Sequence, residues 1–157
     1  MVKGDIKLIV YDFDGVMTDN RVYVTQDGKE SVVCNRGDGL GVNMIRDMSI
    51  PQIILSTETN EVVQQRAKKL GIHAIHGSGN KKQSLASYCL EKKISFSEVL
   101  YVGNDLNDLE VMQQVEMPVC PADAHEKIRE LSSHVTKARG GEGVVRELAE
   151  WLMMKGM

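Results

Sequence analysis

The sequence lacks the features that mark membrane, secreted and nucleic-acid-binding proteins. No apolar run approaches the roughly 18 residues that cross a bilayer, and the N-terminal residues show no signal-peptide pattern. Lys and Arg number 19 against 22 Asp and Glu, and the two kinds are interspersed, without the basic stripe of a nucleic-acid-binding protein. We therefore expect a cytoplasmic protein that binds neither membranes nor nucleic acid.

Cysteine is also scarce, with only Cys34, Cys89 and Cys120. The odd number and wide spacing exclude a disulfide framework and a zinc site of the CxxC kind, so we interpret them as reduced, mostly buried thiols. By contrast, apolar residues make up 42% of the 157 residues. That length and composition predict a single domain, 1–157, with one hydrophobic core.

Short apolar runs alternate with stretches whose apolar residues recur at helical spacing. We predict strands at 6–10, 50–55, 73–75, 99–102, 118–120 and an edge strand at 135, and helices at 39–48, 60–70, 81–92, 106–115, 125–131 and 143–154. Asp27-Gly28 between two β-prone runs predicts a β-hairpin insertion of about 20–34. This order predicts an α/β fold: a three-layer, Rossmann-like parallel sheet with helices on both faces.

Ligands of such sheets bind beyond the carboxyl ends of the strands, and the first predicted strand ends in Asp12 and Asp14. Carboxylates two residues apart on an extended chain point the same way, which is costly unless a cation lies between them. A solvated acidic turn is the alternative, but the pair directly follows a buried strand. An EF-hand loop is excluded, because Val16 and Met17 stand where a ligand and the turn glycine belong.

Polar residues follow the other predicted strands as well. Ser56 and Thr57 come after the strand 50–55, where a hydroxyl can hold a phosphate oxygen, although both residue types are also common helix caps. Lys81 opens a predicted helix, where its charge opposes the helix dipole; this favours a functional role, with Lys82 as the neighbouring alternative.

The strand 99–102 leads into a segment with four oxygen-bearing side chains within five residues: Asn104, Asp105, Asn107 and Asp108. Such a group suits a hard cation. It also suits the cap of the following helix, and the two roles can coexist.

Together, DFDGVMT at 12–18, Ser56, Lys81 and GNDLND at 103–108 resemble the four ordered motifs of the haloacid dehalogenase superfamily, over nearly the whole chain. The DGVMTDN start, the hairpin, Asp38-Gly39 and the tail RGGEGVVRE at 139–147 are similar to a narrower, capless branch. That branch contains the phosphatases of 3-deoxy-octulosonate 8-phosphate and of 2-keto-3-deoxynononate 9-phosphate.

The resemblance implies a phosphatase that works through an aspartyl phosphate. Asp12 would attack phosphorus, and Asp14 would protonate the leaving oxygen and then activate water. Ser56 and Lys81 would hold the phosphoryl oxygens.

The resemblance also implies a Mg²⁺ site made of Asp12, the backbone carbonyl of Asp14 and the fourth motif, with Asn104, Asp105 and Asp108 as candidate ligands. Most of the superfamily has aspartate where Asn104 stands, and an amide oxygen contributes no negative charge. A degenerate domain kept for assembly, like that of the sialic-acid cytidylyltransferases, is therefore the alternative to an enzyme. The intact catalytic motifs favour the enzyme.

For the substrate, the resemblance points to Glu58, Arg66 and Lys69, with Thr57 and Arg139 as further binding candidates. Arg66 and Lys69 lie three apart, on one face of a predicted helix. The nononate phosphatase is similar at these three positions, whereas octulosonate phosphatases usually have arginine where Glu58 stands. We therefore expect a nonulosonate 9-phosphate in preference to octulosonate 8-phosphate.

Assembly is expected from the same resemblance. Capless relatives form tetramers in which hairpins pack together and a neighbour's C-terminal segment lies near the site. Here the matching segments are 21–33 and 139–146, so we expect a homotetramer.

Overall fold

The computed structural model describes residues 5–157; the first four residues, part of the segment behind the expectation of no signal peptide, lie outside it. One parallel sheet has the strand order β5-β4-β1-β6-β7-β8. Its strands are β1 (Leu8–Tyr11), β4 (Gln52–Leu55), β5 (His73–Ile75), β6 (Val99–Val102), β7 (Met117–Cys120) and β8 (His134–Val135). The central strand, β1, pairs with both β4 and β6. The predicted sheet, including its edge strand, is confirmed.

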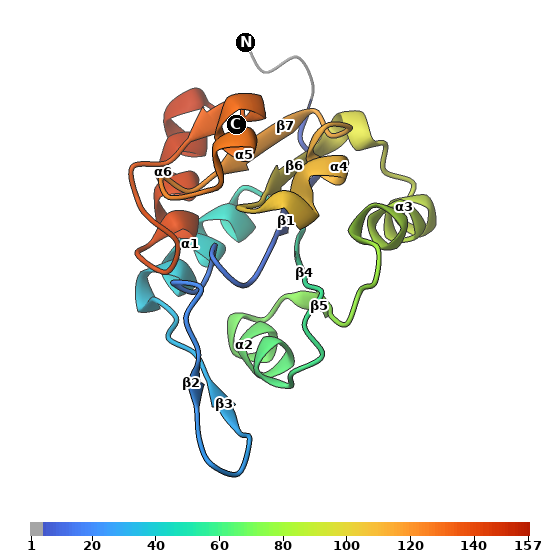
Figure 1. Ribbon diagram of the computed structural model, residues 1–157. Coiled ribbons are helices and arrows are strands. Elements are labelled where there is room, and N and C mark those ends of the chain that lie inside the picture. The colour runs from blue at the N-terminus through green and yellow to red at the C-terminus, as the bar shows by residue number, and fades with distance from the viewer. Residues whose placement is uncertain (1–4) are drawn as a thin grey trace.

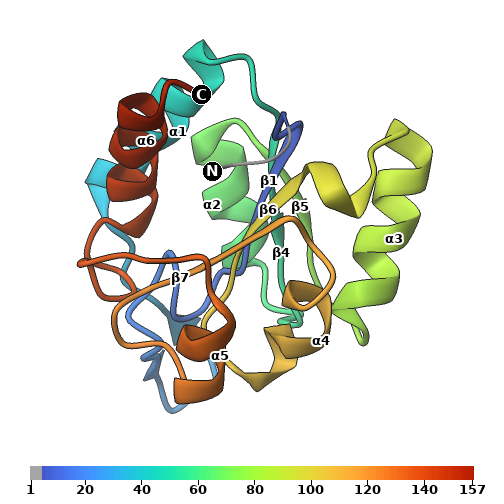
Figure 2. The same cartoon turned by 90° about the horizontal axis from the view of Figure 1, so that it is seen from above.

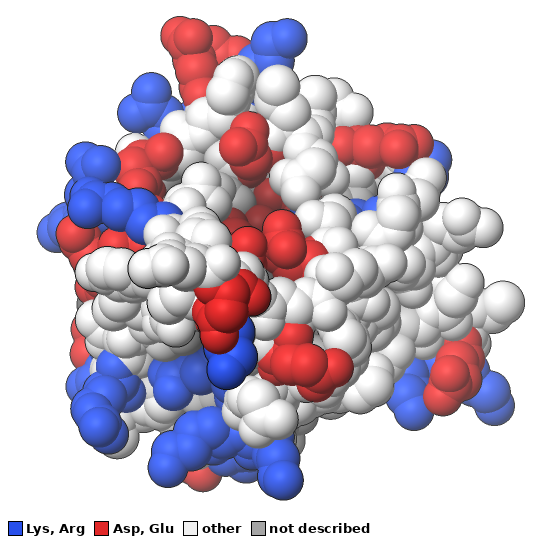
Figure 3. Space-filling model, turned by 60° about the horizontal axis from the view of Figure 1, so that its bottom comes forward, with Lys and Arg blue, Asp and Glu red and all other residues white. Residues whose placement is uncertain are grey.

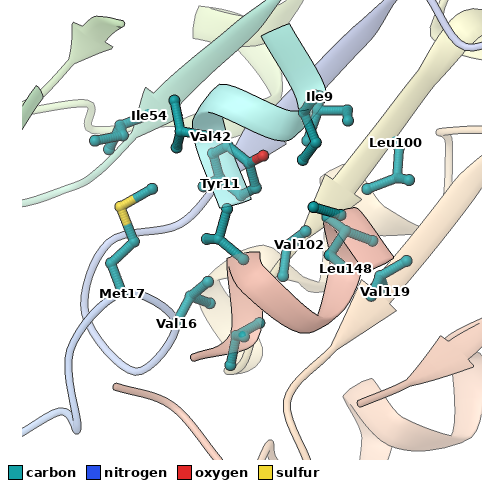
Figure 4. Packing of buried hydrophobic residues seen from close by; sticks show 14 of the residues in the cluster. Ile9, Tyr11, Val16, Met17, Val42, Ile54, Leu100, Val102, Val119 and Leu148 are labelled. Carbon is teal, nitrogen blue, oxygen red and sulfur yellow. The ribbon is translucent and has the colours of Figure 1, made fainter. Parts of the chain in front are cut away.

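Helices cover both faces of this sheet (Figures 1 and 2). One face packs against α1 (Arg36–Asp47), α2 (Val62–Leu70) and α6 (Val144–Lys155). The other packs against α3 (Lys81–Lys92), α4 (Leu109–Met112) and α5 (Glu126–Leu131). Side chains of β1 alternate between the two cores, so Ile9 and Tyr11 join the first while Leu8 and Val10 join the second. Figure 4 shows the first core, with Tyr11 packed among its apolar neighbours.

The hairpin insertion is formed by β2 (Tyr23–Val24) and β3 (Glu30–Ser31), which pair antiparallel and project away from the body (Figure 1). Its paired strands are shorter than the predicted β-prone runs. Tyr23 is 67% exposed and Val24 64%, because only the hairpin's own short ladder holds these residues. The hairpin therefore exposes apolar side chains to solvent.

Two helices, α1 and α2, begin at residues other than those predicted, because nearby side chains cap them. The α1 helix begins earlier than predicted because the Asn35 side chain accepts a hydrogen bond from the Gly37 amide at 2.7 Å. The α2 helix begins later because the Asn60 side chain accepts from the Val62 amide at 3.0 Å.

The predicted helix 106–115 is divided into a 3₁₀ turn, η2 (Leu106–Asp108), followed by the short α4. The Asp105 side chain caps η2 and so forces this tight start. A further 3₁₀ turn, η1 (Phe96–Glu98), was not predicted. Within residues 5–157, no helix combines the length and apolar character that crossing a bilayer requires.

Candidate active site

The carboxyl ends of β1 and β4, which pair side by side, place Asp12 and Ser56 at one edge of the sheet. The Asp12 amide continues the ladder by donating to the Val102 carbonyl at 2.8 Å, and the Ser56 amide donates to the Ile75 carbonyl at 2.8 Å. Both side chains are buried. The Ser56 hydroxyl accepts a hydrogen bond from the Glu58 amide at 3.1 Å, so it also shapes the turn that follows.

Lys81, at the start of α3, lies beside Asp12. Its Nζ lies 2.7 Å from Asp12 Oδ1 and 2.7 Å from Asp108 Oδ1, and its side chain is only 2% exposed. Lys82, the alternative left open by the sequence, instead pairs with Glu110 at the surface at 3.1 Å. The buried position beside Asp12 therefore belongs to Lys81.

Asp108 is fully buried and accepts hydrogen bonds on both oxygens. Its Oδ1 accepts from the Lys81 ammonium at 2.7 Å and from the Tyr101 hydroxyl at 2.8 Å. Its Oδ2 accepts from the backbone amides of Asn104 at 2.9 Å and Asp105 at 3.3 Å. A buried carboxylate is tolerated only when it is compensated in this way.

Burial and the neighbouring charges shift the pKa values of Asp12 and Lys81. Burial raises the pKa of Asp12 to about 7, the Asp108 carboxylate adds to the rise, and Lys81 opposes it. Burial alone would lower the pKa of Lys81, but the carboxylates of Asp12 and Asp108 outweigh it and raise that pKa. Lys81 therefore stays charged, while Asp12 gives up its proton less readily than a solvent-exposed carboxyl does.

Asn104 turns toward Asp12 from the loop after β6. One terminal atom of its amide lies 2.8 Å from Asp12 Oδ2 and 3.0 Å from the backbone carbonyl of Asp14. With the amide nitrogen in that position, Asn104 donates to both acceptors. With the oxygen there, three oxygens converge at about the 2.9 Å spacing of adjacent ligands around Mg²⁺. The donor set therefore fits a hard divalent cation.

Two of the predicted candidate ligands, Asp105 and Asp108, make other contacts in this structure. Asp105 is exposed, and its side chain accepts from the Leu106 amide at 2.7 Å as the cap of η2. Asp108 is occupied by Lys81 and Tyr101. Among residues 5–157, no three His, Cys, Asp or Glu side chains gather into a metal cluster. With the Asn104 oxygen turned inward, the facing oxygens come from one carboxylate, one amide and one backbone carbonyl.

Asp14 occupies a more open position. Its Oδ1 accepts a hydrogen bond from the buried Thr18 hydroxyl at 3.3 Å, which also accepts from the Gly15 amide at 3.2 Å. Burial raises the pKa of Asp14, the Glu58 carboxylate raises it further, and the Thr18 hydrogen bond opposes both. A raised pKa suits a group that must hold a proton and then give it up.

The C-terminal segment packs directly on this loop, which we call the catalytic loop (residues 12–19). The Gly141 amide donates to the Val16 carbonyl at 3.1 Å. A Cβ on Gly140 would lie 2.1 Å from the Gly15 carbonyl oxygen, so only glycine permits this approach. Gly15 itself has φ +82°, and a Cβ there would strike the Asn104 side chain. Glycines on both segments thus allow the catalytic loop and the C-terminal segment to pack in direct contact.

A pocket of about 250 Å³ opens beside Asp14, between the hairpin and the start of α2. Its lining includes the carboxylates of Asp14, Glu30 and Glu58 and, within the described part of the chain, no Lys, Arg or His. Glu30 accepts a hydrogen bond from the Asn60 side chain at 3.0 Å, which ties the hairpin to α2. Acidic side chains accordingly surround the centre of this face (Figure 3). We call this the leaving-group pocket.

The predicted substrate residues are only partly at this pocket. Glu58 lines it, whereas Arg66 and Lys69 do not. One guanidinium nitrogen of Arg66 donates to the Asn35 carbonyl at 3.0 Å, which joins α2 to α1, and Lys69 is exposed. Thr57 is exposed next to Ser56, and Arg139 is exposed with its guanidinium 3.8 Å from the Asp123 carboxylate.

Sequence reasoning missed three residues that shape the site. Tyr101 was interpreted as an ordinary strand residue, and Glu30 as part of the hairpin. Glu147, which accepts from the Lys137 and Ala138 amides at 2.7 Å each, holds the segment before Gly140. Two signals were available: the position of Tyr101, two residues before the glycine that opens the fourth motif, and the place of Glu147 in the tail at 139–147.

Comparison with known proteins agrees with this geometry. The family model for haloacid dehalogenase-like hydrolases matches residues 48–148. The chain belongs to the haloacid dehalogenase-like hydrolases. This confirms the predicted family and the phosphomonoesterase class expected with it. A curated relative, the 3-deoxy-D-manno-octulosonate 8-phosphate phosphatase KdsC of Escherichia coli K12, is 33% identical over 151 residues, covering 96% of this chain and 80% of its own.

Solved structures of haloacid dehalogenase-like hydrolases share the fold as well. A chain from Streptomyces avermitilis assigned to this hydrolase family is 46% identical, with a TM-score of 0.91 over 94% of this chain and 84% of its own. The octulosonate 8-phosphate phosphatase of Moraxella catarrhalis, solved with magnesium, phosphate and KDO, is 31% identical, with a TM-score of 0.91 over 95% and 86%. Magnesium in that relative agrees with the predicted metal.

Proposed function

We propose that this chain is a Mg²⁺-dependent phosphatase that hydrolyses a 2-keto-3-deoxy sugar acid phosphate. The observation that carries the proposal is the Lys81 ammonium shared between Asp12 and Asp108, next to the facing oxygens of Asp12, Asp14 and Asn104. A nucleophilic carboxylate, a fixed cation for the phosphoryl group and a hard-cation site are what phosphoryl transfer needs.

The reaction has two steps on this chain. In the first, an Asp12 oxygen bonds to phosphorus while the bond from phosphorus to the sugar oxygen breaks, and Asp14 gives that oxygen its proton. In the second, Asp14 takes a proton from water, whose oxygen bonds to phosphorus as the acyl phosphate bond breaks and phosphate leaves. Lys81 and Ser56 hold the phosphoryl oxygens throughout.

Asp12, the Asp14 carbonyl and Asn104 would hold Mg²⁺. Its charge offsets the repulsion between the Asp12 carboxylate and the phosphate dianion. With Asn104 in place of aspartate, the set brings one carboxylate charge only, so we expect a modest affinity for Mg²⁺.

For the substrate we propose a nonulosonate 9-phosphate ahead of 3-deoxy-octulosonate 8-phosphate. The curated relatives are named for the octulosonate, so the choice rests on Glu58, which lines the leaving-group pocket. A glutamate there accepts hydrogen bonds from sugar hydroxyls and disfavours an anionic group.

The substrate's own carboxylate needs a cation that the pocket lining lacks within residues 5–157. We therefore propose that the chain acts as one capless domain in a cytoplasmic homotetramer, where a second copy supplies cations such as Lys69 or Arg139. The exposed hairpin would form the contact. Light scattering should give a tetramer, and Tyr23→Glu should reduce its order and its kcat/KM. A wild-type monomer with full activity would contradict the assembly.

The experiment that tests the function is a phosphate-release screen over eight- and nine-carbon keto-deoxy acid phosphates and simple phosphomonoesters, with Mg²⁺ and with EDTA. We expect metal-dependent release, highest on a nine-carbon acid. No release from any compound would reject the phosphatase and favour the assembly domain suggested by Asn104.

A further inference from the structure

Tyr101 reaches the candidate site from the hydrophobic core. It lies in β6 and is fully buried, and its ring belongs to the core on the α3, α4 and α5 face, with Leu85 and Val111. Its hydroxyl donates to Asp108 Oδ1 at 2.8 Å. The phenol is thus held rigidly by apolar packing while its one polar atom faces the charged network.

Asp108 links two functional parts of the site. The oxygen that accepts from Tyr101 also accepts from the Lys81 ammonium, and the other oxygen holds the backbone amide of Asn104 at 2.9 Å. Any change in the charge on Asp108 is therefore felt by the phosphate-binding cation and by the segment that carries Asn104.

We propose that Tyr101 is a positioning residue for phosphoryl transfer, acting through Asp108 on Lys81; this rests on the proposed phosphatase function. By donating to Asp108, the hydroxyl takes up part of that carboxylate's hydrogen-bonding demand, so Lys81 is not drawn wholly to Asp108.

The effect matters most in the transition state. When Asp12 bonds to phosphorus, its negative charge passes to the phosphoryl oxygens, and Lys81 has to follow it. Without the Tyr101 hydroxyl, Asp108 competes more strongly for the ammonium at that moment. The loss is therefore one of transition-state stabilisation more than of substrate binding.

Tyr11 provides a matched control. It is also a fully buried tyrosine, its hydroxyl donates to the Gln52 side chain at 2.8 Å, and its ring lies in the core on the opposite face of the sheet. Tyr101→Phe and Tyr11→Phe each remove one buried hydroxyl and one hydrogen bond. A purely structural role predicts similar losses of thermal stability and no difference in catalysis.

The first measurement is kinetic, at a temperature where all three proteins are folded by circular dichroism. We expect Tyr101→Phe to lower kcat about tenfold or more with less than about a threefold change in KM, and Tyr11→Phe to keep kcat within about twofold. Equal kcat values for the two variants would overturn the proposal.

If Tyr101→Phe does not fold, 3-fluorotyrosine is incorporated instead, once at position 101 and once at position 11. A change in kcat at position 101 alone supports the proposal. No change in kcat at either position overturns it.

The second measurement needs no turnover. Calorimetry with Mg²⁺ present compares orthovanadate, which imitates the transition state, with inorganic phosphate. We expect Tyr101→Phe to weaken vanadate binding about tenfold and phosphate binding less than about threefold, with Tyr11→Phe unchanged. Equal losses for both anions, or a wild type that binds neither, overturn the proposal. A wild type that binds vanadate but hydrolyses no phosphomonoester rejects the proposed function alone.

Discussion

The two sides of the candidate site are built differently. On the phosphate side, Asp108 is buried and both its oxygens are occupied by donors. On the leaving-group side, the carboxylates of Asp14, Glu30 and Glu58 share one pocket whose lining, among residues 5–157, includes no Lys, Arg or His. The pocket there is walled by the exposed hairpin and the start of α2.

This difference in packing matches the roles that we propose for the two sides, which are reaction chemistry on one and substrate recognition on the other. In the proposed reaction, the groups that meet the transferring phosphoryl group are fixed by strand ends and one helix start, where the backbone is held by the sheet. Groups that meet the rest of the substrate lie on segments with little packing of their own, which can change without disturbing the sheet. Three changes test this division, and a fourth tests a buried carboxylate outside both sides.

The largest effect is expected from Asp12→Asn. The amide cannot form the acyl phosphate, so we expect a loss of about 10⁴-fold or more in kcat. The fold should remain, because Asn keeps an acceptor for Lys81. Phosphate release gives the rate and circular dichroism the fold. Asp14→Asn should be severely impaired as well. Substantial turnover by Asp12→Asn would reject the covalent mechanism.

Glu58→Arg tests the leaving-group side. The change removes a carboxylate from the pocket and adds a cation, so kcat/KM should shift toward the octulosonate 8-phosphate relative to the nonulosonate 9-phosphate by about tenfold, or about 1.4 kcal/mol. The rate on p-nitrophenyl phosphate should change least, because its leaving group needs no proton from Asp14, whose pKa Glu58 raises. A wild type that already prefers the octulosonate tenfold would overturn the substrate preference.

Asn104→Asp tests the metal set. A second carboxylate adds negative charge at the facing oxygens, so the Mg²⁺ concentration for half-maximal rate should fall severalfold. The matched control is Asn107→Asp, which adds the same charge on the exposed turn η2. An unchanged or higher Mg²⁺ requirement in Asn104→Asp would mean that Asp105 or Asp108 supplies the ligand instead.

The smallest effect concerns Asp38, a buried residue of α1 whose Oδ1 accepts from the Val145 amide at 3.1 Å. Burial raises its pKa from 3.8 to about 6, against backbone hydrogen bonds that lower it. The folded state therefore binds this proton more tightly than the unfolded chain, and the stabilising contribution present at low pH is lost as pH rises through about 6.

Asp38→Asn should remove that dependence. The difference in free energy of unfolding between wild type and variant should change by on the order of 1–3 kcal/mol between pH 4 and pH 7, with the wild type gaining at low pH. Urea denaturation across this range measures it, with Asp47→Asn on the exposed side of α1 as the control. A flat difference would mean that Asp38 is ionised alike in both states.

The sequence predicted the phosphate side better than the leaving-group side, for a physical reason. An apolar run followed by a polar residue fixes both the strand and the side chain beyond it, so Asp12 and Ser56 lie at the strand ends where they were predicted. Lys81 was distinguished from Lys82 only by burial in the folded chain. Asp108 was one candidate ligand and one candidate cap, because caps, metal ligands and lysine partners all use carboxylates and the sequence does not separate these roles.

Other features depended on contacts between distant segments. Tyr101 carries no local sign of its hydrogen bond to Asp108. Arg66 and Lys69 share a helix, as predicted, but the path of the hairpin decides which residues line the pocket. Helix starts shifted because Asn35 and Asn60 use their side chains as caps, a choice that the residue type permits but does not impose.

The packing of the catalytic loop against Gly140 and Gly141 also affects when the site can form during synthesis of the chain. During synthesis Asp12 and Asp14 precede these glycines by more than 120 residues. Until they emerge, the segment carrying Asp12 and Asp14 lacks the surface that fixes its shape, and contacts so distant along the chain form late. A chain that stops short of Gly140 would therefore carry Asp12, Asp14, Ser56 and Lys81 without the surface that holds the catalytic loop in place.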